Sequence, residues 1–176
     1  MSSASAQLKA LFFEENVRRA PLGSVTRSLV EQACDVGEVI ELPDGSSGIA
    51  HNKRLLACDF DEEALLAVAQ NAGAEATLVV FGLGMGHTVR GLRAVSRAPI
   101  VVFEPDPGIV RSYFESGPSD LGDVTIVCTT HDLGQIWQKV SHGNQSVTVV
   151  NTPGYAELFP EQAKLVCETV AELRLG

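Results

Sequence analysis

The stretch LVVFGLGMGH, residues 78–87, decides the fold class of this chain because it joins an apolar run to three alternate glycines. A second apolar run at residues 100–103 follows, and Glu104 comes directly after it. This order predicts a strand, a glycine loop, a helix, a second strand and a carboxylate. Glycines let the backbone turn sharply and approach a ligand closely, and the helix that begins near Gly86 directs free N–H groups at the same spot. The stretch therefore predicts a nucleotide-type pocket.

The glycines Gly82, Gly84 and Gly86 follow a Gly-x-Gly-x-Gly spacing rather than the Gly-x-Gly-x-x-Gly of dinucleotide-binding proteins. This spacing resembles the first motif of S-adenosylmethionine-dependent methyltransferases. Gly84 is expected to have a positive φ where the backbone passes closest to a ligand. Glu104 is placed to accept hydrogen bonds from the two hydroxyls of a ribose. The alternative is that the glycines only allow a tight turn between strand and helix, with no ligand bound.

The chain after residue 76 alternates regularly between apolar runs and amphipathic segments. Such alternation indicates parallel strands that are joined by right-handed crossovers. We therefore expect an α/β fold, a Rossmann-like three-layer sandwich whose four main parallel strands lie in the order 3-2-1-4, with the topological switch point above Gly82. The expected strands are residues 77–81, 100–103, 124–128 and 146–150, and the expected helices are residues 86–95, 107–116, 132–140 and 160–174.

The first part of the chain is expected to form separate elements before this core. Apolar residues at helical spacing predict two short helices, at residues 4–15 and 24–35. A strand at residues 38–42, a Pro-Asp-Gly-Ser turn and an extended stretch that ends at Cys58 predict a β-hairpin. The expected division is an N-terminal helical segment (1–36), a β-hairpin (37–58) and a Rossmann-like α/β core (59–176).

The residues that follow the four expected strands should border one crevice, because the carboxyl ends of parallel strands meet at one edge of the sheet. His87 is a candidate contact for a phosphate or carboxylate, or simply a polar surface side chain. Asp132 stands where methyltransferase-like folds place an acid near the adenine, but we favour the interpretation that Thr130 or Asp132 caps the helix that follows the third expected strand. The segment NTPGY, residues 151–155, departs at two positions from the Asn-Pro-Pro-aromatic motif of amino-methyltransferases, so we interpret it as a turn. The candidate cofactor-binding residues are Gly82, Gly84, Gly86, His87, Glu104, Asp132 and Asn151.

Other kinds of chemistry are not indicated. No nucleophile elbow, P-loop or paired-carboxylate arrangement is visible, so no catalytic residue is assigned. The four cysteines and four histidines lack ligand spacing, which indicates reduced core thiols and no metal site. The formal net charge of −9 disfavours nucleic acid and anionic membranes as partners. An apolar span of about 18 residues and a signal peptide are both missing, so a soluble cytoplasmic protein is expected.

Three segments carry a likeness to a known family: LLACDFDEEA (55–64), FGLGMG (81–86) and VFEPD (102–106). Together they resemble the N-terminal domain of the motility-associated factor family, which are large bacterial cytoplasmic proteins that transfer nonulosonic acid sugars onto flagellin. The likeness covers roughly residues 40–170. It implies an accessory Rossmann-like domain that is inactive alone, because transfer chemistry belongs to a downstream central domain related to sialyltransferases. The implied partners are the downstream domains of the parent protein and flagellin.

The length of the chain agrees with that expectation. Only part of the sheet of a complete methyltransferase fold is accounted for, so we expect the protein to continue past Gly176. The competing function is a methyltransferase that acts on a small molecule, with the glycines, Glu104 and Asp132 around S-adenosylmethionine or another nucleotide-type ligand. A third class is an interaction module, in which the acidic surface and the hairpin dock other domains or flagellin.

Overall fold

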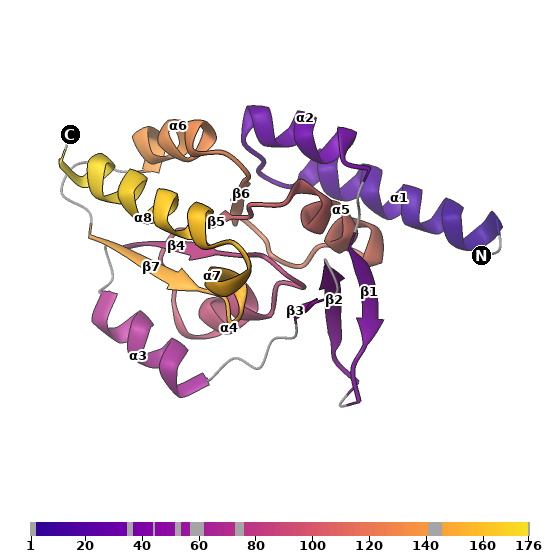
Figure 1. Ribbon diagram of the computed structural model, residues 1–176, viewed down its shortest axis with the longest axis horizontal. Coiled ribbons are helices and arrows are strands. Elements are labelled where there is room, and N and C mark those ends of the chain that lie inside the picture. The colour runs from indigo at the N-terminus through magenta and orange to yellow at the C-terminus, as the bar shows by residue number, and fades with distance from the viewer. Residues whose placement is uncertain are drawn as a thin grey trace.

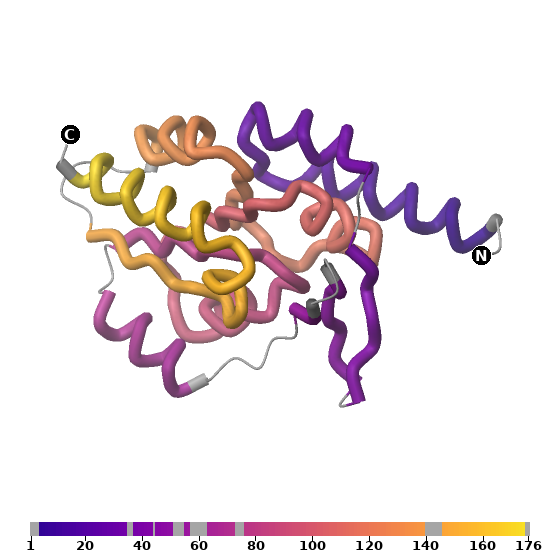
Figure 2. The backbone as a smooth tube through the Cα atoms, in the orientation of Figure 1, coloured from indigo at the N-terminus to yellow at the C-terminus, as the bar shows by residue number. Residues whose placement is uncertain are grey.

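The computed structural model describes residues 3–34, 37–43, 45–51, 54–56, 62–72, 76–140 and 146–175. A parallel β-sheet lies between two layers of helices, and a smaller antiparallel sheet and two N-terminal helices pack at one end (Figure 1). This is the Rossmann-like α/β sandwich that the sequence predicts. The two termini lie at opposite ends of the molecule (Figure 2). Among the described residues, no helix combines the length and the apolar character needed to cross a membrane.

The parallel sheet has the predicted order. Its strands lie in the order β6-β5-β4-β7, which is 3-2-1-4 when the four strands are counted along the chain. Every residue of the first two strands is buried, as their continuous Val, Ile, Leu and Phe runs require when helices cover both faces. After β4 the chain adds β5 and then β6 on one side of this strand and later adds β7 on its other side, so the switch point lies at the carboxyl end of β4. The strands are β4 (Thr77–Phe81), β5 (Ile100–Phe103), β6 (Thr125–Val127) and β7 (Val147–Asn151).

Helices lie on both sides of the sheet. They are α3 (Glu62–Ala72), α4 (His87–Val95), α5 (Pro107–Ser116), α6 (Thr130–Val140), α7 (Tyr155–Leu158) and α8 (Pro160–Leu175). Of these, α4, α5 and α6 connect the successive strands of the sheet. Figure 1 shows α3 and α4 on one side of the sheet and α6 and α8 on the other. The bounds of α5 match the prediction, because Asp106 caps the helix by accepting a 2.7 Å hydrogen bond from Gly108 N and Pro107 takes the first turn. The single turn α7 was not predicted.

The N-terminal part forms α1 (Ser3–Arg19), α2 (Ser24–Gln32) and three antiparallel strands, β1 (Glu38–Glu41), β2 (Ser47–His51) and β3 (Arg54–Leu56). The predicted β-hairpin is confirmed by β1 and β2, which pair antiparallel, but the extended stretch expected to end at Cys58 also contributes β3, which was not predicted. Arg54 is paired with His51 and Leu56 with Ile49, so β3 runs antiparallel to β2. Residues 52–53, and the predicted boundaries at residues 36 and 58, lie outside the described residues, so the division into three segments stays a prediction.

One hydrophobic core joins the N-terminal elements to the parallel sheet. Val17 of α1, Val30 of α2 and Ile49 of β2 belong to the same buried cluster as the apolar residues of β4 and β5. The free edge of β6 is covered by the segment between α1 and α2, because Ile126 N donates to Pro21 O at 2.9 Å. Gly23 N donates back to Ile126 O at 3.1 Å. The N-terminal part thus protects one edge of the sheet.

The cysteines divide between core and surface. Cys128 is buried as predicted, and burial raises the pKa of its thiol. The prediction of core thiols is wrong for Cys34 and Cys167, which are exposed on helical or loop surface. Cys58 lies outside the described residues.

Candidate functional site

The glycine loop has the backbone conformation that its sequence predicts. Gly82, Gly84 and Gly86 have φ values of 97°, 51° and 78°, all in the left-handed region that favours glycine. The positive φ expected at Gly84 is therefore confirmed. Gly86 is the N-cap residue of α4, so the loop delivers the helix N-terminus to the carboxyl edge of the sheet as expected.

Glu104 turns toward this loop from the end of β5. Its Oε2 atom accepts a hydrogen bond from Leu83 N at 2.7 Å and a second from the Tyr155 hydroxyl at 2.7 Å. The Oε1 atom accepts a hydrogen bond from Asp106 N at 3.1 Å. The residue is fully buried, and burial raises the pKa of its carboxyl to about 7, although the three donated hydrogen bonds act in the opposite direction.

Tyr155 fills the space between the glycine loop and Glu104. Its hydroxyl accepts a hydrogen bond from Gly84 N at 2.8 Å while it donates to Glu104. A Cβ at Gly82 would collide with the tyrosine ring, so the absence of a side chain there is what admits the ring. The ring also meets Phe81 edge to face, with centroids 6.1 Å apart. Tyr155 is fully buried by these contacts.

Thr152 anchors the turn that carries this tyrosine. Its backbone N–H donates to Phe81 O at 2.9 Å, and its hydroxyl donates to Gly82 O at 2.6 Å. Gly154, with a φ of 79°, then starts α7 at Tyr155. The turn after β7 is thereby hydrogen-bonded to the end of β4, and this position of the backbone places the Tyr155 ring over the glycine loop.

The phenol of Tyr155 therefore takes the contacts that the sequence assigned to a ligand. The hydroxyl donates to the strand-end carboxylate, as a ribose hydroxyl was expected to do, and it satisfies a loop amide as well. Sequence analysis missed this residue because it treated residues 151–155 as a turn only. The available signal was an aromatic residue directly after a glycine turn at the carboxyl end of the strand beside β4.

Asp132 acts as a helix cap, as predicted, but it caps an earlier helix than the predicted one. Its Oδ2 atom accepts hydrogen bonds from the backbone N–H and the hydroxyl of Thr26, both at 2.7 Å, and Oδ1 accepts from Val25 N at 3.2 Å. Burial acts to raise the pKa of Asp132, but these hydrogen bonds outweigh it and hold the pKa below its ordinary value. Asp132 therefore caps α2, while Thr129 caps α6 by accepting from Asp132 N at 3.1 Å.

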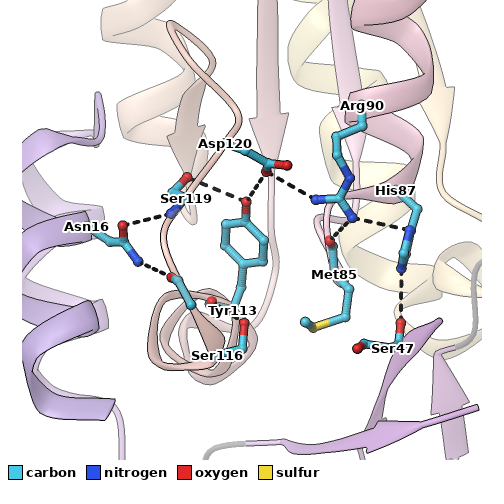
Figure 3. Close-up of polar contacts among 10 residues, drawn as sticks. Asn16, Ser47, Met85, His87, Arg90, Tyr113, Ser116, Ser119 and Asp120 are labelled. Carbon is cyan, nitrogen blue, oxygen red and sulfur yellow. Dashed lines mark hydrogen bonds and ion pairs between the residues drawn. The ribbon is translucent and has the colours of Figure 1, made fainter. Parts of the chain in front are cut away.

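His87 faces the small sheet rather than the filled crevice. Its Nε2 atom lies 3.0 Å from Ser47 O, and its Nδ1 atom lies 3.2 Å from Arg90 Nη2 (Figure 3). These partners assign the proton to Nε2, which donates, and leave Nδ1 as the acceptor. Arg90 also donates to Met85 O at 2.8 Å and pairs with Asp120 at 3.2 Å.

This polar cluster continues through α5 to α1. The Tyr113 hydroxyl donates to Asp120 Oδ1 at 3.0 Å, and Asn16 accepts from Ser119 N at 2.9 Å (Figure 3). The hollow that His87, Arg90 and their neighbours line has a volume of about 320 Å³. Because its polar groups are already paired with one another, the cluster fastens the small sheet and the loop after α5 to the core.

The seven predicted cofactor-binding residues therefore fall into separate places. The structure brings Gly82, Gly84 and Glu104 together around Tyr155. It directs His87 to the small sheet and Asp132 to α2. Gly86 is the N-cap residue of α4, and Asn151 ends β7 as an exposed residue.

A parallel sheet with a left-handed glycine loop at the switch point and a strand-end carboxylate defines a Rossmann-like α/β domain. The structure is similar to that of the MAf glycosyltransferase from Magnetospirillum magneticum AMB-1, with a TM-score of 0.59 and 11% sequence identity. The similarity covers 97% of this chain and 35% of that protein, so the chain spans about a third of its length. At this identity the likeness concerns the fold. No family model and no curated protein matches the sequence.

Proposed function

We propose that this chain is an accessory Rossmann-like domain of a flagellin-glycosylating, motility-associated glycosyltransferase of the bacterial cytoplasm, and that it performs no transfer chemistry alone. Two independent features support the proposal. The segments around the glycine loop and Glu104 resemble the N-terminal domain of that family. The fold of nearly the whole chain is similar to about a third of a MAf glycosyltransferase. The remaining domains would supply the transfer reaction and the contacts with flagellin.

The observation that carries the non-catalytic part of the proposal is the position of Tyr155. A nucleotide-type ligand would need the Gly84 amide and the Glu104 carboxylate, and both are bonded to the tyrosine hydroxyl. Expelling a fully buried tyrosine would cost about 3–5 kcal/mol, by analogy with large core truncations. That cost would weaken the apparent affinity of a ligand by about two to nearly four powers of ten. The glycines and Glu104 then serve the internal packing of the domain.

Calorimetric titration with S-adenosylmethionine and its demethylated product tests this part. We expect no binding heat at millimolar ligand for the unmodified chain. Micromolar binding that disappears in Glu104→Ala would overturn the proposal and favour a methyltransferase that acts on a small molecule. Because Glu104→Ala also removes buried hydrogen bonds, its fold is checked by circular dichroism, and Gly84→Val provides a second variant that blocks the loop.

The accessory role is tested in the parent protein. Its open reading frame should continue well past Gly176 into a glycosyltransferase region. A Gly84→Ala variant of that protein that folds normally should glycosylate flagellin at the unmodified rate, since the loop holds no reacting group. A rate reduced by tenfold or more in a normally folded variant would contradict the accessory role.

A further inference from the structure

The second edge of the parallel sheet, formed by β7, differs from the edge at β6. The N-terminal segment pairs with β6 at the first edge. Among the described residues, β7 pairs with β4 on one side, and no strand lies on the other side of β7. Its sequence, Val-Thr-Val-Val-Asn, contains no charge and no proline, although these residues commonly protect open edges. An uncharged edge of high strand propensity is complementary to another strand.

The ladder fixes which backbone groups of β7 are directed outward. Thr77 N donates to Ser146 O, and Thr152 N donates to Phe81 O, each at 2.9 Å. Because bonding groups alternate along a parallel strand, Thr148 and Val150 face β4. The backbone N–H and C=O groups of Val147, Val149 and Asn151 therefore point away from β4, and within the described part of the chain they bond to no other backbone group.

The position of α8 indicates the direction of the missing partner. Figure 1 shows α8 running antiparallel to β7, from the end where β7 stops to the end where it starts. It packs against α6 on one side of the sheet, and α6 is the helix that crosses from β6 to β7. A right-handed crossover that continues in the same direction must use that same side. A segment that continues from α8 would thus enter parallel to β7 on its open edge.

We infer that β7 is completed by a further parallel strand from the polypeptide that follows α8 in the longer protein, an inference that rests on the proposed function. The strand is recognised by its backbone, which bonds to the outward groups of Val147, Val149 and Asn151. A second copy of the chain is a weaker candidate, because a twofold axis would pair β7 antiparallel with itself and bring together two chains of net charge −9.

Residue-resolved amide hydrogen exchange tests the inference. In the chain of residues 1–176, the Val149 amide should exchange at least about tenfold faster than the Val150 amide, which is bonded to β4. In the longer protein the Val149 amide should slow by more than about tenfold. Equal Val149 exchange in the two proteins would overturn the inference. Protection in the chain of residues 1–176 that rises with protein concentration would also overturn it, in favour of pairing between two copies.

The variant Val149→Pro provides an independent readout. Proline lacks the outward N–H, whereas the β4 ladder does not use that group and should survive. Val149→Ala keeps the N–H and is the matched control. In the longer protein, Val149→Pro should raise the rate of proteolysis in the segment after α8 by about tenfold over the control. Equal rates would contradict the inference. If the Val149 amide is protected from exchange in the longer protein but the region after α8 is unrelated to glycosyltransferases, only the proposed function is refuted. If that region is a glycosyltransferase and the Val149 amide is not protected, only the inference is refuted.

Discussion

Replacing Tyr155 by phenylalanine removes one hydroxyl from the centre of the filled crevice. That hydroxyl donates to Glu104 Oε2 at 2.7 Å and accepts from Gly84 N at 2.8 Å, and all three groups are buried. A hydrogen bond to a charged group contributes about 1.5–3 kcal/mol, and a buried N–H without a partner costs about 1–3 kcal/mol. Because the two effects share one atom and do not add fully, we expect Tyr155→Phe to lower the free energy of unfolding by about 2–4 kcal/mol.

The loss should depend on pH, since the pKa of Glu104 is about 7. At about pH 8 the carboxyl is ionised, so Tyr155→Phe removes a charge-assisted hydrogen bond from it. At about pH 5 the carboxyl is protonated, so the same variant removes a neutral hydrogen bond that contributes about 1 kcal/mol. Urea denaturation at both pH values measures the difference. Tyr113→Phe is the matched control, because its hydroxyl bonds to the half-exposed Asp120, and a loss below about 1 kcal/mol is expected. A Tyr155→Phe loss no larger than that of the control at about pH 8 would refute this account of the crevice.

Three further predictions concern the same fold. Asp132→Ala should lower the free energy of unfolding, measured by urea denaturation, by about 2–3 kcal/mol, because it removes the cap of α2. The control Asp123→Ala, at an exposed position, should change it by less than about 0.5 kcal/mol, and similar losses in the two variants would contradict the capping role of Asp132. Gly84→Val should cost about 1–3 kcal/mol because its φ of 51° strains a β-branched residue, and an unchanged melting temperature would argue against that strain. The stability that Glu104 contributes should be fully present below about pH 4.5 and fall by about 3 kcal/mol as pH rises to about 7, because folding raises the pKa of its carboxyl. The variant Glu104→Gln should lack this pH dependence, and an equal pH dependence in both proteins would assign it to another group.

The sheet was predictable because its signal is local. Each of the four parallel strands is an apolar run bounded by turn residues, and the alternation with helices leaves few orders for the strands. The bounds of α5 follow from Asp106 and Pro107, which are adjacent in sequence and act on the helix that they begin. Where the cause of a structure lies within a few residues, the sequence reveals it.

The candidate site was less predictable because its contacts are distant in sequence. Asp132 caps a helix through Thr26, 106 residues away, so its partner could not be recognised from local spacing. Tyr155 meets Gly84, 71 residues away, only because the turn after β7 is fastened to the end of β4. The glycine pattern specifies a backbone that admits a close neighbour, but it does not specify whether that neighbour is a ligand or a side chain.

Tyr155 occupies the crevice in place of a ligand. The most direct measurement is an NMR titration that follows the backbone amide of Gly84 while S-adenosylmethionine is added up to millimolar concentration. We expect this amide to stay bonded to the tyrosine hydroxyl, so its chemical shift should remain constant throughout the titration. A saturable shift of the Gly84 amide at micromolar ligand, accompanied by loss of the Tyr155 contact, would contradict it.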